Sequence, residues 1–166
     1  IENFLKEKNL FTVELLMYKY TKLYEKFRKT WEKRKKICTK IECFFNIPSI
    51  PYGTFRNNTD ITSSPLYDIG CYIFSLLVDL KISLESLKIT NKTIKNDKIL
   101  SLSLSGFSND LEIYAEFGIK KEYKNLVNLK FGKDNHITFE KFFYGIKEKK
   151  QISFCKTNKC KVLLIE

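Results

Sequence analysis

The segment LSLSLSGFSNDLEIYAEF, residues 100–117, alternates apolar and polar side chains almost without interruption. A period of two is typical of a β-strand with one buried and one solvated face. The residues from Gly106 to Asp110 favour a turn, so the segment predicts two antiparallel strands. A third strand is expected at about 126–131. We therefore expect an antiparallel meander in this half of the chain.

Outside the meander, helical spacing dominates. From Phe11 to Phe45, apolar residues recur at intervals of three and four, which predicts one long amphipathic helix with a basic outer face. Residues 69–87 show the same spacing and predict a buried core helix, and residues 137–147 favour a further helix near the C-terminus. Short strands are expected at 152–154 and 162–165. The predicted class is α+β, with the core helix packed on a twisted antiparallel sheet.

The chain divides into three parts on composition. Residues 1–46 are helical and basic, residues 47–66 hold all three prolines and read as a linker, and residues 67–166 form an α+β domain. The longest apolar run, residues 69–78, is about half as long as a membrane span. No membrane partner is therefore expected.

Charge is the main functional signal in the composition. The chain has 27 lysines, three arginines and a net charge of +11, which favours a polyanionic or acidic partner. Lysine is a hydrated point charge, whereas base and phosphate readout favours the arginine fork. The abundance of Lys, Ile, Asn and Phe also indicates A/T-rich coding. The excess charge thus points to neutralisation of phosphates rather than to sequence-specific readout.

Motifs for catalysis are absent from the sequence. There is no P-loop, no GxGxxG and no HExxH, and the only histidine, His136, lies in a segment that resembles an exposed turn. Asp68 and Asp79 flank the core helix and are interpreted as a cap and a surface residue. We expect no enzyme, cofactor or metal. An enzyme of unfamiliar type remains an alternative, with a pocket around His136 or Cys71.

Five cysteines at wide spacings argue against a disulfide scaffold and favour a reducing compartment. Cys155 and Cys160 flank a possible hairpin tip. Two readings stay open for this pair. It forms a disulfide, or it supplies two ligands of a zinc site that other groups complete.

A resemblance emerges from the order of features after Leu100. Gly106-Phe107-Ser108 follows an alternating strand, Gly118-Ile119 comes twelve residues later, and 130–134 (KFGKD) precedes a predicted helix with a basic end. In this order, residues 70–160 resemble the second domain of the ribosomal large-subunit protein L-six family. The resemblance implies a structural constituent of the large subunit near the stalk base and factor-binding site, in a divergent organellar form, mitochondrial before plastid.

The resemblance also implies partners and contacts. Large-subunit rRNA and neighbouring ribosomal proteins are the expected partners, with no small-molecule substrate. The expected rRNA contacts are all basic side chains in loops, at helix ends or in the tail: Lys33, Arg34, Lys35, Lys36, Lys92, Lys95, Lys147, Lys149, Lys150, Lys156, Lys159 and Lys161. The alternative is a non-enzymatic basic α+β module that binds an acidic protein through its long helix.

Overall fold

The alternating segment folds as predicted into a hairpin, β3 and β4, within a larger sheet. The computed structural model describes residues 2–9, 15–48, 53–54, 63–144, 149–157 and 159–165. Its strands are β1 (Lys40–Ile47), β2 (Leu87–Lys95), β3 (Lys98–Ser108), β4 (Leu111–Ile119), β5 (Lys124–Lys130), β6 (Asn135–Glu140), β7 (Lys150–Lys156) and β8 (Lys159–Ile165). They form one eight-stranded sheet in the order β2-β3-β4-β1-β5-β6-β7-β8. The α+β class is confirmed.

The sheet is mixed rather than antiparallel, because β1 inserts between β4 and β5. It runs parallel to β4 and antiparallel to β5. The predicted meander is therefore interrupted: its second and third strands are separated by a strand that comes some 70 residues earlier in the chain. Ile41, Cys43 and Phe45 alternate along β1 and are buried on the face that the helices cover.

The prediction of one long N-terminal helix is wrong. The described helical segments are α1 (Glu2–Glu7), η1 (Met17–Tyr20), α2 (Lys22–Arg34), η2 (Lys35–Ile37), the π turn η5 (Leu66–Gly70), α3 (Cys71–Asp79) and η6 (Leu84–Ser86). The helix begins at residue 22 because Thr21 caps it, accepting a hydrogen bond from the Tyr24 amide at 3.2 Å. Within these limits the predicted apolar face is correct, since Leu23, Phe27 and Trp31 are buried.

Two other predicted helices need correction. The core helix ends at Asp79 rather than at residue 87, because Lys81 adopts a left-handed backbone conformation with φ of 61° and reverses the chain. The helix expected at 137–147 is replaced by β6 and a turn at Lys141, whose φ is 51°. Residues 145–147 of that expected helix lie outside the described residues.

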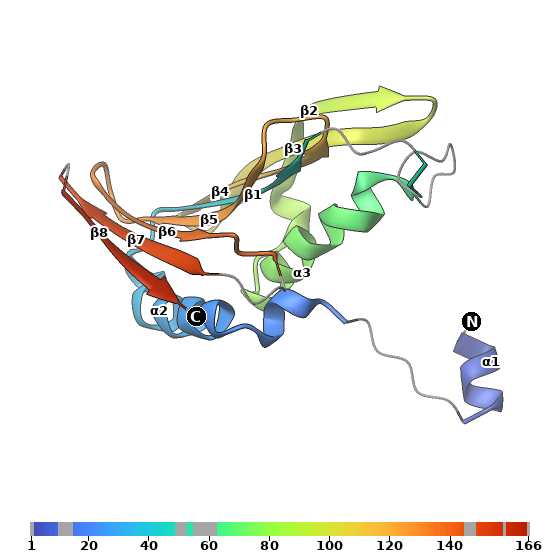
Figure 1. Cartoon of the computed structure of the whole chain (residues 1–166), viewed down its shortest axis with the longest axis horizontal. Coiled ribbons are helices and arrows are strands. Elements are labelled where there is room, and N and C mark those ends of the chain that lie inside the picture. The colour runs from blue at the N-terminus through green and yellow to red at the C-terminus, as the bar shows by residue number, and fades with distance from the viewer. Residues whose placement is uncertain are drawn as a thin grey trace.

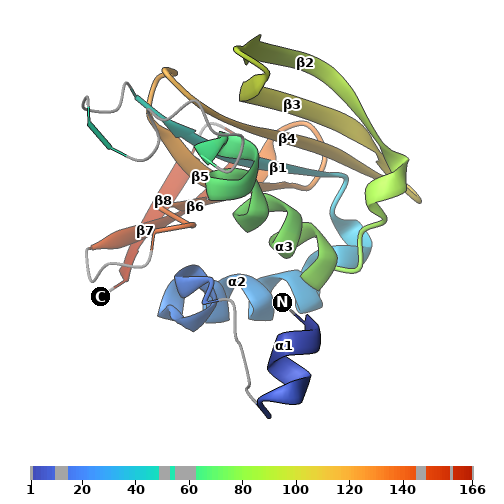
Figure 2. The same cartoon turned by 90° about the vertical axis from the view of Figure 1, so that its right-hand side faces the viewer.

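Helices α2 and α3 cover one face of the sheet, as both views show (Figures 1 and 2). Between them and the strands lies an aromatic cluster in which Phe27 meets Phe139 and Phe142, with ring centroids 5.2 and 4.9 Å away. Tyr18 and Phe143 extend the cluster towards β1. The division at residues 46 and 66 stays a prediction, although β1, from the first segment, is an inner strand of the sheet. No helix among the described residues is long and apolar enough to cross a membrane.

Asp79 fixes the N-terminal helical segments to the end of α3, so it is more than a surface residue. Its carboxylate accepts hydrogen bonds from the Tyr24 hydroxyl at 2.7 Å and from the Lys19 ammonium at 3.1 Å. Arg28 donates to its backbone carbonyl at 3.1 Å. Burial, and then the hydrogen bond to Asp79, raise the pKa of Tyr24 to about 12.

This raised pKa predicts a loss of stability in alkali. The unfolded chain releases the Tyr24 proton from about pH 10, whereas the folded chain holds it to about pH 12. Its contribution is thus complete below pH 10 and is lost as the pH rises to 12. We expect Tyr24→Phe to flatten this fall by about 1 kcal/mol, after allowing for solvent screening. Urea unfolding of the wild-type protein and of Tyr24→Phe at pH 8, 10 and 11.5 measures the free energy of unfolding of each. An equal fall of this free energy with pH in the two proteins would refute the prediction.

Candidate functional site

The parallel strands β1 and β4 end together at one edge of the sheet. Asn46 pairs with Gly118 and Ile47 with Ile119, so both carboxyl ends lie side by side. In open sheets with parallel strands, ligands bind outside these carboxyl ends. We call this edge the carboxyl edge. Candidate site residues lie there on both faces of the sheet.

On the helix-covered face, the carboxyl edge carries the π turn η5 and the first turn of α3. Single π turns are frequent at functional sites. Gly70 packs this turn against β4 so closely that an added Cβ would lie 2.8 Å from the Phe117 ring. The packing places Asp68 and Tyr72 one turn apart, both partly exposed, with the Tyr72 ring 5.5 Å from that of Phe45.

On the open face, Glu116 is the centre of a hydrogen-bonded group at the same edge. Its carboxylate accepts from the Asn46 amide at 2.6 Å and from the Tyr114 hydroxyl at 2.8 Å, and it pairs with the Lys121 ammonium at 3.2 Å. The side chain is only 18% exposed. Burial raises its pKa, but the hydrogen bonds and the nearby lysine outweigh burial and lower it overall. Glu116 therefore stays ionised near neutral pH.

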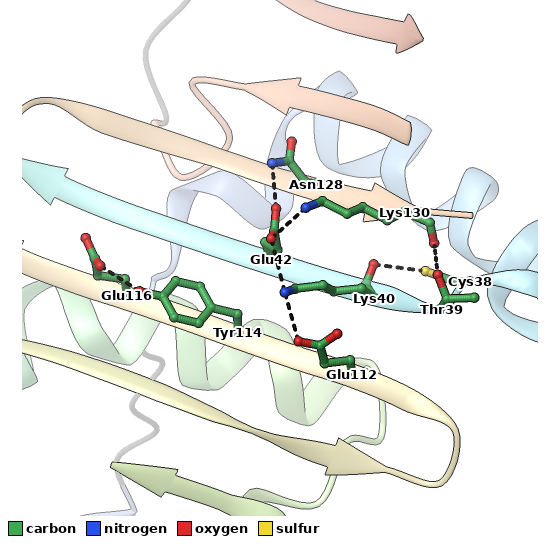
Figure 3. Close-up of polar contacts among 9 residues, drawn as sticks. All are labelled: Cys38, Thr39, Lys40, Glu42, Glu112, Tyr114, Glu116, Asn128 and Lys130. Carbon is green, nitrogen blue, oxygen red and sulfur yellow. Dashed lines mark hydrogen bonds and ion pairs between the residues drawn. The ribbon is translucent and has the colours of Figure 1, made fainter. Parts of the chain in front are cut away.

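A second partly buried carboxylate, Glu42, lies further along the open face (Figure 3). It accepts hydrogen bonds from Lys130 at 2.8 Å and Asn128 at 3.2 Å, and Lys40 bridges it to Glu112. Burial is again outweighed by these donors, so the pKa of Glu42 is lowered. Because both carboxylates are already occupied by protein donors, they position neighbouring groups and are poor proton acceptors.

The predicted lysines do not form one patch. Lys33 and Arg34 end α2, and Lys35 and Lys36 lie in η2. Lys92 and Lys95 lie on edge strand β2, whereas Lys156, Lys159 and Lys161 lie in the hairpin of β7 and β8 at the other edge. Lys149 is exposed, and Lys147 lies outside the described residues. Lys150 is buried and donates to the Tyr144 carbonyl. The role of the exposed ones as individual contacts stays a prediction.

The other candidate residues take ordinary structural positions. His136 lies in β6 between Lys130 and Cys155, rather than in a turn. The Cys71 thiol donates to the Asp68 carbonyl at 3.6 Å. Cys155 and Cys160 form a disulfide, which settles the choice between a bridge and zinc ligands. Among the described ranges, no three His, Cys, Asp or Glu side chains gather as a metal site.

Sequence reasoning missed Asn46, Glu42 and Glu116. A signal for Glu116 was present, since residues 112, 114 and 116 alternate with the buried Ile113, Ala115 and Phe117 and must share the opposite face. Nothing local marks Asn46 or Glu42, because the apolar spacing predicts a helix that continues to Phe45.

Known structures share this fold. No family model and no curated protein matches the chain. A 3-ketoreductase from Actinomadura kijaniata, KijD10, solved with NADP and TDP-benzene, matches with a TM-score of 0.76 and 14% identity over 99% of this chain and 52% of its own. A Gfo/Idh/MocA family oxidoreductase from Vibrio cholerae matches with a TM-score of 0.65 and 10% identity over 92% and 44%. A putative oxidoreductase, yvaA, from Bacillus subtilis matches with a TM-score of 0.59 and 11% identity over 96% and 52%. The chain spans about half the length of these proteins.

These matches overturn the ribosomal resemblance. They cover nearly the whole chain with one oxidoreductase fold, whereas the resemblance used residues 70–160 and a helix that is a strand. A role in the large subunit, with rRNA and ribosomal proteins as partners, is therefore wrong. The similar structures are oxidoreductases. The same finding therefore corrects the expectation of a non-enzymatic protein without a small-molecule substrate. It also corrects the alternative of a non-enzymatic module that binds an acidic protein.

Proposed function

We propose that the chain is the substrate-side domain of an NADP-dependent oxidoreductase that acts on a keto or hydroxyl group of a nucleotide-linked sugar. The observation that carries the proposal is the match of 99% of the chain to 52% of the 3-ketoreductase, with a TM-score of 0.76. That enzyme was solved with NADP and TDP-benzene, a nucleotide-linked ligand. The carboxyl edge supplies the residues that face such a ligand.

The residues of this chain do not fit the dinucleotide itself. Binding of a dinucleotide in an open sheet uses a glycine-rich turn between a strand and a helix N-terminus. The sequence has six glycines and no GxGxxG pattern, and the glycine before α3 is packed against Phe117 with no room for a phosphate. We therefore expect another domain or subunit to bind the dinucleotide.

The chain's own contribution is to place and protonate the substrate. Reduction of a ketone leaves its oxygen in need of a proton, and a positioned phenol is a suitable donor. Tyr72 is the partly exposed phenol at the start of α3, held by its ring contact with Phe45. Asp68, one turn earlier, is placed to accept a hydrogen bond from a substrate hydroxyl.

A titration with thymidine diphosphate tests the proposal on the chain itself. We expect saturable changes in the amide NMR signals of residues 66–72, with a dissociation constant of roughly 10 μM to 1 mM, the usual range for enzyme substrates. Inorganic pyrophosphate is the control for attraction by the net charge of +11. Equal responses to both compounds, or none at residues 66–72, would contradict a nucleotide-linked substrate at this edge.

A further inference from the structure

The disulfide between Cys155 and Cys160 lies in the hairpin of β7 and β8, at the outer edge of the sheet (Figure 1). The two cysteines are directly opposite each other in the paired strands and are five positions apart in the sequence. A bridge over so short a loop removes less entropy from the unfolded chain than a long-range bridge does. Cys38, Cys43 and Cys71 remain free thiols, so this bridge is not part of a disulfide framework.

Thiols in solution can reach the bridge from the side of β8. Cys160 is exposed, as are the other residues of β8 before Ile165, and Cys155 is partly exposed. Exposed disulfides are the labile ones, because exchange requires a thiolate to attack one of the two sulfur atoms. Cys160 is the more accessible target, so Cys155 carries the sulfur that leaves.

His136 is the side chain beside the leaving sulfur. In β6, Ile137 and Phe139 are buried against the helices, so His136 points to the open face of the sheet. It is directly opposite Cys155 in the neighbouring strand, a position at which Cβ atoms are about 5 Å apart. The imidazole and the two sulfur atoms therefore lie in one row across β6, β7 and β8. An imidazole so placed is suited to give a proton to a departing thiolate.

The charge around the bridge favours an anionic reactant. Three lysines are neighbours of the cysteines in the hairpin: Lys156, Lys159 and Lys161. Strands β7 and β8 contain no acidic residue. An acid beside the hairpin is the exposed Asp134, whose backbone carbonyl accepts a hydrogen bond from the Thr157 amide at 3.2 Å. Positive charges near a cysteine stabilise its thiolate and attract anionic thiols from solution.

We propose that the bridge between Cys155 and Cys160 is a thiol–disulfide exchange site for a small anionic thiol of the glutathione class, with His136 as the general acid. The incoming thiolate attacks the Cys160 sulfur, the bond to Cys155 breaks, and the electron pair leaves on the Cys155 sulfur, which His136 protonates. A second thiolate then attacks the sulfur of the first thiol in the mixed disulfide and releases Cys160.

This sequence balances, because two thiols are oxidised to their disulfide while the bridge is reduced to two thiols. The proton of the first thiol ends on Cys155 and that of the second on Cys160. The proposal does not rest on the proposed ketone reduction, since it uses neither NADP nor any residue of the carboxyl edge.

The test incubates the complete protein in a mixture of reduced and oxidised glutathione that is poised like the cytosol. Acid quenching, alkylation and peptide mass spectrometry then measure the fraction of Cys155 and Cys160 that is reduced. We expect about half or more of the bridge to open, and to close again when oxidised glutathione is added in excess. A bridge that stays closed is a structural disulfide, and this result would overturn the proposal.

His136→Gln separates a role in the reaction from a role in the structure. We expect the rate of reduction by glutathione to fall about tenfold, less than the usual effect of a general acid because a thiolate is a good leaving group. The fraction reduced at equilibrium should not change, since a general acid alters rates in both directions equally. An unchanged rate, or a change in the equilibrium fraction that accounts for the slower rate, would overturn the role of His136.

A charge variant tests the preference for an anionic thiol. Lys159→Gln should lower the rate with glutathione, relative to the rate with the uncharged 2-mercaptoethanol, by about threefold. Lys88→Gln is the matched control, because Lys88 is an exposed lysine on β2 at the other edge of the sheet, and it should leave this ratio unchanged. An equal ratio in the wild-type protein and in Lys159→Gln would contradict the glutathione class as the reactant.

Discussion

Replacing Tyr72 by phenylalanine is expected to lower kcat for NADPH-dependent ketone reduction by about 100-fold, the lower bound for loss of a general acid. The variant keeps the ring, and with it the contact with Phe45 at 5.5 Å. It removes the Tyr72 hydroxyl, which is the proposed proton donor to the ketone oxygen. KM should change little, because binding of the nucleotide does not depend on the phenol. The expectation follows from the proposed function and is measured on the complete protein as NADPH consumption.

The matched control is Tyr20→Phe, which removes the same hydroxyl from an exposed tyrosine on η1 and should leave kcat unchanged. Thermal unfolding of both variants checks that the fold is intact. An unchanged kcat in Tyr72→Phe would remove the phenol from the mechanism. The nucleotide titration at residues 66–72 would still test the substrate-side assignment, so the two failures are distinguishable.

Local patterns in the sequence were sufficient for the elements that pair with near neighbours. The hairpin of β3 and β4 follows from the alternation at 100–117, and β7 and β8 pair across a short turn. β1 was missed because it follows α2 after only a short segment, η2, and continues its apolar run. Its alternation becomes meaningful only once β4 and β5 are known to flank it.

The candidate sites were beyond local reasoning for the same reason. The hydrogen bond between Asn46 and Glu116 joins residues 70 positions apart, and it depends on the insertion of β1 beside β4. The ribosomal resemblance is wrong because it takes the spacing of Gly106 and Gly118 as the mark of a ribosomal protein. An added Cβ at Gly106 would lie 2.1 Å from the Ser86 carbonyl oxygen, and at Gly118 2.5 Å from the Ser101 side chain. These glycines are required by close contacts within this fold.

Replacing Phe27 by alanine is expected to destabilise the protein by about 3–5 kcal/mol, the usual cost of removing a fully buried aromatic side chain from a core. Phe27 is completely buried, and its ring makes edge contacts with Phe139 and Phe142 that join α2 to the sheet. Domains of this kind are stable by about 5–15 kcal/mol in total, so the loss is roughly a fifth or more of the whole. We expect the melting temperature to fall by about 10 °C.

Phe107→Ala is the matched control for this core substitution. It makes the same chemical change on β3, where the ring is 63% exposed, and we expect an effect within about 0.5 kcal/mol. Phe27→Leu should lie between the two, because leucine retains most of the apolar volume but loses the edge contacts. Urea unfolding of the three variants orders them directly. Similar losses for Phe27→Ala and Phe107→Ala would show that α2 is not held to the sheet through this cluster.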